Sequence, residues 1–133
     1  MLTNVREITI ENLHNEVMMK KREGFRFSTM TCCDLGETYD ILYHFDKDYV
    51  FHNLRLALKK GEKLPSISHL FFAAVLIENE IIDMFGIEFT DIIIDYKGRF
   101  LISDGAPTTP LNKNVNMAVE LKVLSQNTVE GAK

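Results

Sequence analysis

Three carboxylates lie close together in one stretch of the sequence, where they are the first candidates for chemistry. Glu78, Glu80 and Asp83 fall in a segment with helical periodicity, in which each residue advances about 100° around the axis. Glu80 and Asp83 are three residues apart and therefore neighbours, and a carboxylate pair can do acid–base chemistry. An acid–base enzyme that uses this pair, with His69 as a further group, is one hypothesis. Because no nucleophile or histidine lies beside the pair in the sequence, a solvated or partner-contacting face is favoured.

Glu78 interrupts what is otherwise an apolar helical face. A buried carboxylate without a partner is unfavourable by several kcal/mol, so Glu78 needs a cation or donors, from this chain or from a partner. A salt bridge within the chain, or a solvated edge, is an equally good interpretation. The predicted apolar face comprises Phe71, Ala74, Val75, Ile82 and Phe85, whereas Asn79, Glu80 and Asp83 fall on the other side.

Metal, phosphate and nucleic-acid sites are not indicated by the sequence. His44 and His52, with Asp46 and Asp48 nearby, match no metal-ligand spacing and are expected to be solvent-facing strand residues. The seven glycines form no phosphate-binding loop. A net charge of −4 and a pI near 5.5 argue against nucleic acid, whose phosphates require clustered cations.

The composition describes one ordinary domain of 133 residues, with 46% hydrophobic and 26% charged residues. The adjacent Cys32 and Cys33 cannot form a disulfide framework, which favours a reducing, cytoplasmic setting. No apolar signal segment opens the chain, and Leu70–Ile77 is the longest apolar run. Eight residues are far fewer than the roughly 20 that span a bilayer.

Alternating apolar residues predict three strands that form an antiparallel meander, at Phe25–Cys33, Tyr39–Phe45 and Tyr49–Leu58. A short strand at Asn4–Ile10 and a helix at Glu11–Glu23 are expected before them. The first strand of the meander is predicted to place Phe25, Phe27, Thr29 and Thr31 on one face. The second places Tyr39, Ile41, Tyr43 and Phe45 together, and the third Val50, His52, Leu54, Leu56 and Leu58.

The main helix is predicted to begin at Pro65 or Ser66, capped by Ser66 or Ser68, and to end near Phe85 with Gly86 as the stop. Ile92–Ile94 and Arg99–Ile102 are expected to form a second hairpin. The predicted fold is α+β, a two-layer sandwich with a mostly antiparallel sheet and helices on one face. Residues 1–104 form its single domain, and residues 105–133 an extended tail in which 115–124 has weak helical character.

The run from Ile77 to Phe89 resembles the signature of the 30-kilodalton subunit of respiratory complex I, the NADH–quinone oxidoreductase. Two glutamates separated by one residue are followed by Asp83-Met84-Phe85-Gly86-Ile87 and by Phe89. Weaker matches extend the resemblance from about residue 25 to residue 111. They comprise Pro65-Ser66, Ala73-Ala74, Thr31 to Asp34, Tyr43, Gly98 to Leu101 and Pro110-Leu111.

Several family residues are absent, which makes a divergent relative a better match than the full respiratory enzyme. Asn79 stands where the family usually has Arg, and Asn112 follows Pro110-Leu111 in place of Arg. The Gly-His-Pro that follows the family's final Phe is replaced by residues 90–92. Together with the short chain, these differences make the resemblance closest to the small subunit of energy-converting membrane-bound [NiFe] hydrogenases.

The resemblance implies a subunit without flavin, iron–sulfur cluster or metal of its own, in a hydrogenase-like or complex I-like assembly. It implies docking on the large subunit, the one similar to hydrogenase or to the 49-kilodalton protein of complex I, beside iron–sulfur subunits. The implied location is the cytoplasm, peripheral to the membrane. The isolated chain is expected to be able to form a homodimer. An interaction module with the same fold but another partner, and the acid–base enzyme, are the alternatives. The residues expected at the partner interface are Glu78, Glu80, Asp83, Phe85, Gly86, Pro110 and Leu111.

Overall fold

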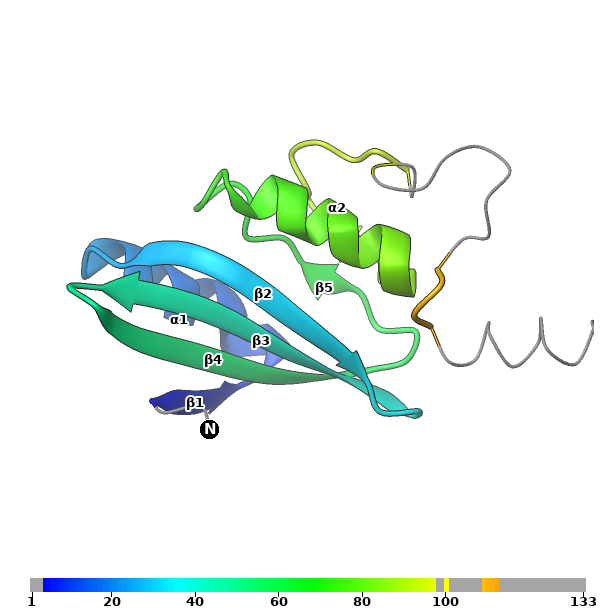
Figure 1. Ribbon diagram of the computed structural model, residues 1–133, viewed down its shortest axis with the longest axis horizontal. Coiled ribbons are helices and arrows are strands. Elements are labelled where there is room, and N and C mark those ends of the chain that lie inside the picture. Colours follow the sequence, from blue (N-terminus) through cyan, green and yellow to red (C-terminus); the bar gives the residue numbers. More distant parts are fainter. Residues whose placement is uncertain (1–3, 98–99, 101–108, 113–133) are drawn as a thin grey trace, which may run out of the picture.

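A computed structural model describes residues 4–97, 100 and 109–112 of the chain (Figure 1). It has a sheet with two helices and a smaller strand pair, and thus confirms the α+β class. The strands of the sheet are β1 (Val5–Ile8), β2 (Arg26–Asp34), β3 (Thr38–Lys47) and β4 (Val50–Lys59). The other elements are α1 (Ile10–Arg22), α2 (Ala74–Phe85), β5 (Leu64–Pro65) and β6 (Phe89–Thr90).

The sheet order is β1-β4-β3-β2. The predicted meander is confirmed, because β2 pairs with β3 and β3 with β4 in antiparallel fashion, and the sheet is mixed because β1 joins β4 in parallel. Strands β1 and β2 therefore run in the same direction at opposite edges, and α1 makes the crossover between them. Both helices pack on one face of the sheet. In Figure 1, α2 lies closer to the viewer than α1 does.

Strand β3 supplies the centre of the core. Tyr39, Ile41, Tyr43 and Phe45 are all buried on the helix side, as the alternation predicted. Strand β4 contributes Leu54, Leu56 and Leu58, as also predicted. The helices cover this face with side chains that include Leu13, Val17, Ala74 and Phe85.

Strand β2 departs from its predicted alternation at a β-bulge. The register with β3 shifts between Phe27 and Thr29, and an extra residue reverses which side chains face the core. Phe27 is half-buried against the core, whereas Met30 rather than Thr29 or Thr31 is buried farther along. The prediction that both threonines share a face with Phe27 was therefore wrong.

The main helix begins at Ala74 and not at Pro65 or Ser66. Leu64 and Pro65 form β5, which pairs with β6, and neither Ser66 nor Ser68 is an N-cap. Instead their hydroxyls hydrogen-bond each other at 2.7 Å, and the amide of Ser68 donates to Ser66 Oγ at 3.0 Å. This local hydrogen bonding competes with helix formation, so an apolar run that looks helical opens with turns.

The first half of the predicted second hairpin does not form a strand. Ile92–Ile94 has no strand structure, and the preceding β6 pairs with β5 instead. Most of the other half, Arg99–Ile102, lies outside the described residues, as does the predicted tail except for Thr109–Asn112. No described helix has the length and apolar character needed to cross a membrane.

Candidate functional site

Helix α2 carries most of the predicted site residues and ends where the sequence predicted. Gly86 adopts a left-handed conformation (φ 77°) and its amide donates to the carbonyl of Ile82 at 2.9 Å. This is a typical glycine termination of a helix. The last carbonyl groups of α2 still need donors, because no further turn follows.

Those donors come from a distant segment, Thr109–Asn112, which we call the clasp. The amides of Thr109 and Leu111 donate to the carbonyls of Asp83 and Met84 at 3.1 and 2.8 Å. The side-chain amide of Asn112 donates to the carbonyl of Phe85 at 2.7 Å. The clasp therefore completes the C-terminal cap of α2. The sequence analysis predicted Pro110 and Leu111 only as interface residues and did not predict this capping role.

The clasp is also joined to the sheet through Tyr39. Asn112 Nδ2 donates to the Tyr39 hydroxyl at 2.7 Å, and that hydroxyl donates to the carbonyl of Phe85 at 3.3 Å. The rings of Tyr39 and Phe85 meet edge to face, with centroids 6.0 Å apart. Lys60 Nζ lies 4.0 Å from the centroid of the Tyr39 ring and pairs with the buried Asp34 at 2.7 Å. One network thus fixes the clasp, the helix end and the sheet.

Glu78 is fully buried between α2 and the sheet. Its Oε1 accepts a hydrogen bond from the amide of Ile67 at 2.8 Å, whereas Oε2 has no hydrogen-bond partner among the described residues. Burial raises the pKa of Glu78 to about 7, although the nearby hydroxyl of Ser66 and the Ile67 amide lower it. Of the alternatives left open by the sequence, contact with the chain's own backbone is the one observed.

Tyr43 places a second buried polar group in the same region. Its hydroxyl has no hydrogen-bond partner among the described residues, and burial, followed by the charge of Glu78, raises its pKa well above the usual value. Two acidic groups that both disfavour ionisation are thus enclosed by the core. The sequence identified Glu78 because it interrupts an apolar face, but it did not indicate that Tyr43 lies close to it.

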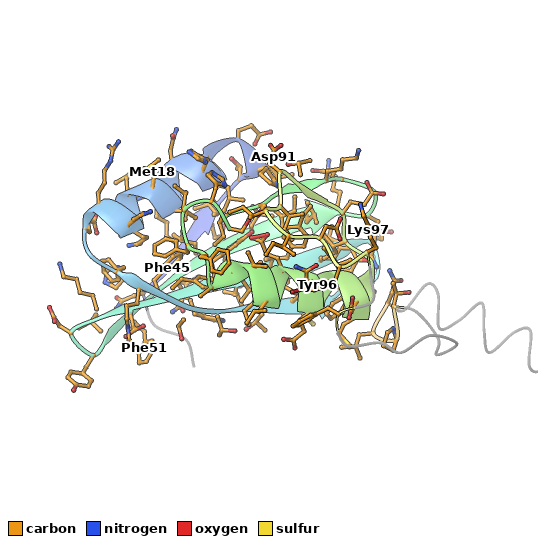
Figure 2. The ribbon with its side chains drawn as sticks, turned by 90° about the horizontal axis from the view of Figure 1, so that it is seen from above. Met18, Phe45, Phe51, Asp91, Tyr96 and Lys97 are labelled. Carbon is orange, nitrogen blue, oxygen red and sulfur yellow. The ribbon has the colours of Figure 1, made fainter. Side chains whose placement is uncertain are left out.

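Asn79 is a structural residue on the side of α2 opposite the predicted apolar face, and the sequence did not show that this side is covered. It is buried, and its side chain pairs with the backbone of residues 94–96 much as a neighbouring strand would. Its Nδ2 donates to the carbonyl of Ile94 at 2.7 Å, and its Oδ1 accepts from the amide of Tyr96 at 3.0 Å. Figure 2 shows Tyr96 lying over α2, where this pairing holds it.

Glu80 and Asp83 have different environments, which argues against an acid–base pair. Glu80 is exposed and Asp83 is buried. His69 stacks on His14, with ring centroids 5.2 Å apart. Four open hollows lined by described residues lie elsewhere, and none of these four is lined by Glu80, Asp83 or His69.

The predicted interface residues thus separate into two groups. Glu78, Asp83 and Phe85 are buried within the chain, so direct acidic contact of Glu78 and Asp83 with a partner does not fit this conformation. Glu80, Gly86, Pro110 and Leu111 are exposed.

An exposed apolar surface was missed on α2 and the turn before it. Phe72 and Leu76 are 67% and 52% exposed, and Leu111 of the clasp is 52% exposed beside Met84. Glu80 lies one turn after Leu76 on the same side of the helix. We call Phe72, Ala73, Leu76, Glu80 and Leu111 the α2 surface.

The histidines and cysteines form no metal site in the described part of the chain. His44 follows the inward Tyr43 and therefore points to the outer face of the sheet, whereas His52 pairs with Phe45 and points to the inner face. The expectation that both histidines face solvent was therefore wrong for His52, which contacts Phe25 and Lys20. His44 bridges Thr31 and Asn53 at 2.7 and 2.6 Å across three strands. Cys33 is an exposed free thiol.

A family model for the 30-kilodalton subunit of the respiratory-chain NADH dehydrogenase matches residues 5–120. The chain belongs to this family. An NADH-quinone oxidoreductase subunit of Ruegeria pomeroyi is 34% identical over 106 residues, covering 68% of this chain and 53% of the relative. The same subunit of Jannaschia sp. is 41% identical over 80 residues, covering 54% and 39%, and that of Roseobacter denitrificans is 32% identical over 120 residues, covering 77% and 60%. The chain therefore spans about 39–60% of the length of these relatives.

The family fold also occurs in a chain of a solved archaeal respiratory membrane complex, the membrane-bound sulfane sulfur reductase. The two chains superpose with a TM-score of 0.71, covering 92% of this chain and 76% of the other, at 15% identity. At this identity the match establishes the shared fold.

Proposed function

We propose that the chain is a subunit of a membrane-associated redox complex, without chemistry of its own, and that it docks on the large subunit. That large subunit resembles hydrogenase or the 49-kilodalton protein of complex I, and iron–sulfur subunits are its neighbours. The proposal places the chain on the cytoplasmic side, held at the membrane through the complex and not by a span of its own. Membership of the 30-kilodalton-subunit family supports this role.

The observation that carries the proposal is the exposed apolar α2 surface. Large apolar side chains that gather on one face are typical of interaction sites. Leu76 lies on α2 and Leu111 on the clasp that caps the end of this helix, and both are exposed. The proposed partner contacts both. Glu80 supplies a carboxylate beside them, which suits a basic residue of the partner.

The buried site residues support this surface from within. The clasp places Pro110 and Leu111 beside Met84 because the backbone of α2 accepts its amides. Glu78 and Phe85 anchor the helix to the segments beneath it. On this proposal Glu78, Asp83, Phe85 and Gly86 shape the interface, whereas Glu80, Pro110 and Leu111 contact the partner.

Affinity purification from cells that make the complex tests the proposal. The tagged chain is expressed in its native cells, and material recovered in mild detergent is analysed by mass spectrometry for the large subunit. Leu76→Ser and Leu111→Ser should each reduce its recovery, whereas Met19→Ser, at a comparably exposed position on α1, should not. Recovery of no redox subunit with the unaltered chain would refute the proposal and favour a stand-alone interaction module.

A further inference from the structure

The hairpin between β3 and β4 ends in a turn that its own residues do not favour. Asp48 and Tyr49 both have left-handed backbone conformations, with φ of 51° and 66°. Two-residue hairpin turns of this kind prefer Asn-Gly, because glycine adopts positive φ without strain. Tyrosine is rarely found there. Sparsely populated backbone conformations of this kind cluster at binding sites, where a functional requirement keeps a residue that destabilises the fold.

Folding leaves three large apolar side chains at this turn in solvent. Tyr49 is 99% exposed, and the following Val50 and Phe51 are 48% and 56% exposed. We call residues Asp48–Phe51 the aromatic tip. Tyrosine and phenylalanine are enriched at the centres of protein interfaces, where they bring large area at low cost in conformational entropy.

The surroundings of the aromatic tip are basic although the whole chain is acidic. Residues 20–26 and 46–51 contain five basic and three acidic side chains, against 15 and 19 in the chain. Arg26 pairs with Asp46 at 2.7 Å, and Lys47 Nζ donates to the carbonyl of Glu23 at 2.5 Å. An open notch of about 450 Å³ lies beside the tip, lined by Gly24, Arg26, Asp46, Lys47, Asp48 and Tyr49.

We propose that the aromatic tip is a second docking element, which inserts into an apolar pocket of a neighbouring protein subunit. Carboxylates of that neighbour flank the pocket on the side that faces Lys21 and Arg22. The proposal rests on the proposed function, because the neighbour is another member of the same complex. The aromatic tip and the clasp lie at opposite ends of the molecule (Figure 1).

A protein pocket suits these residues better than a membrane surface does. Clusters that attract anionic lipids contain about 4–8 Lys or Arg residues. Here Lys20, Arg26 and Lys47 already have partners within the chain, which leaves Lys21 and Arg22 as the two cations that the proposal uses. The concave notch beside Tyr49 offers a place for a side chain of a protein partner.

Footprinting of the intact complex tests the proposal. Hydroxyl-radical oxidation of Tyr49 and Phe51 is measured by mass spectrometry in the free chain and in the complex purified through the tag. Both residues should be oxidised readily in the free chain and lose that reactivity in the complex. A benzoylphenylalanine at position 49 should, on irradiation, cross-link to a neighbouring protein at a peptide that contains Asp or Glu.

A paired substitution separates binding from folding. The variant with Asp48→Asn and Tyr49→Gly carries the favoured turn, so its unfolding midpoint should rise or stay level, while Phe51 loses its protection in the complex. Undiminished oxidation of the tip in an intact complex would overturn the inference and leave the proposed function standing. A cross-link to lipid alone would overturn it in favour of a membrane contact. Failure to recover any complex would overturn both proposals.

Discussion

Asn112 donates a hydrogen bond from its side-chain amide to the carbonyl of Phe85, 27 residues earlier in the chain, at 2.7 Å. The same nitrogen donates to the Tyr39 hydroxyl, so one side chain joins the clasp to the end of α2 and to the sheet. The short side chain of Asn112 can make both hydrogen bonds because both acceptors lie within reach of its Nδ2.

Removing that amide should loosen the clasp. Asn112→Ala deletes two hydrogen bonds, each of which contributes about 1 kcal/mol, so the free energy of unfolding should fall by about 1–2 kcal/mol. Urea denaturation measures the change. Asn15→Ala, at an exposed position on α1, is the control and should change stability by less than about 0.5 kcal/mol. Equal effects of the two substitutions would contradict the role assigned to Asn112.

A side chain at Gly86 should push the clasp away from the helix. An alanine Cβ there would lie 2.7 Å from Cγ2 of Thr109, and the backbone has φ 77°. Gly61→Ala is a matched control, because its φ is 89° and nothing lies within 4 Å of the added carbon. Both variants pay about 1–2 kcal/mol for the left-handed conformation, and Gly86→Ala should be the more destabilised in thermal unfolding.

Shortening Thr109 should relieve that clash. In the double variant with Gly86→Ala and Thr109→Ser, the methyl group that the new Cβ meets is absent, so part of the extra loss should be recovered. A double-mutant cycle measures the coupling between the two positions. Strict additivity of the two effects would show that the clasp does not press on Gly86.

Stability should fall as the pH rises through the pKa of Glu78. That pKa is raised from an ordinary 4.5 to about 7 by burial, so between these values the folded state holds a proton that the unfolded state has released. The group's contribution is therefore full below about pH 4.5 and is lost as the pH rises through 7. The difference is about 3 kcal/mol. Chemical denaturation across this range should show a steeper decline for the unaltered chain than for Glu78→Gln, and parallel profiles would rule out the assignment.

Replacement of Asn79 should free the segment that crosses α2. Asn79→Ala removes the bonds to Ile94 and Tyr96, and because the released backbone groups are partly buried, a loss of about 2–3 kcal/mol is expected. Hydrogen exchange at the Tyr96 amide should accelerate more than exchange within β3. Glu80→Ala, at the next and exposed position, should leave that exchange unchanged.

Uninterrupted patterns in the sequence predicted their elements well. Tyr39, Ile41, Tyr43 and Phe45 alternate without a break, and all four face the core. The bulge after Phe27 reversed the faces of β2, because periodicity cannot show where an extra residue enters a strand. The start of α2 was misplaced because Ser66 and Ser68 hydrogen-bond each other in a turn, which the apolar run after them conceals.

The candidate site was predictable only where the signal was local. Glu78 could be identified because it interrupts an apolar face, and Gly86 because it ends one. Asn79 and Asp83 were placed on the side opposite the apolar face. Their burial was not predicted, because the segments that cover them come later in the chain, at residues 91–97 and 109–112. Helical angles describe one element alone and carry no information about such distant partners.

The distant cap of α2 has a consequence for the growing polypeptide. On the ribosome, residues 74–86 emerge before Asn112, so the carbonyls of Asp83, Met84 and Phe85 wait for donors that have not yet emerged. The link from Tyr39 to Asn112 closes 73 residues of chain. A nascent chain that stops after α2 but before Asn112 exposes uncapped carbonyl groups at the end of the helix. This exposed helix end distinguishes an incomplete chain from a finished one for the cell's quality control.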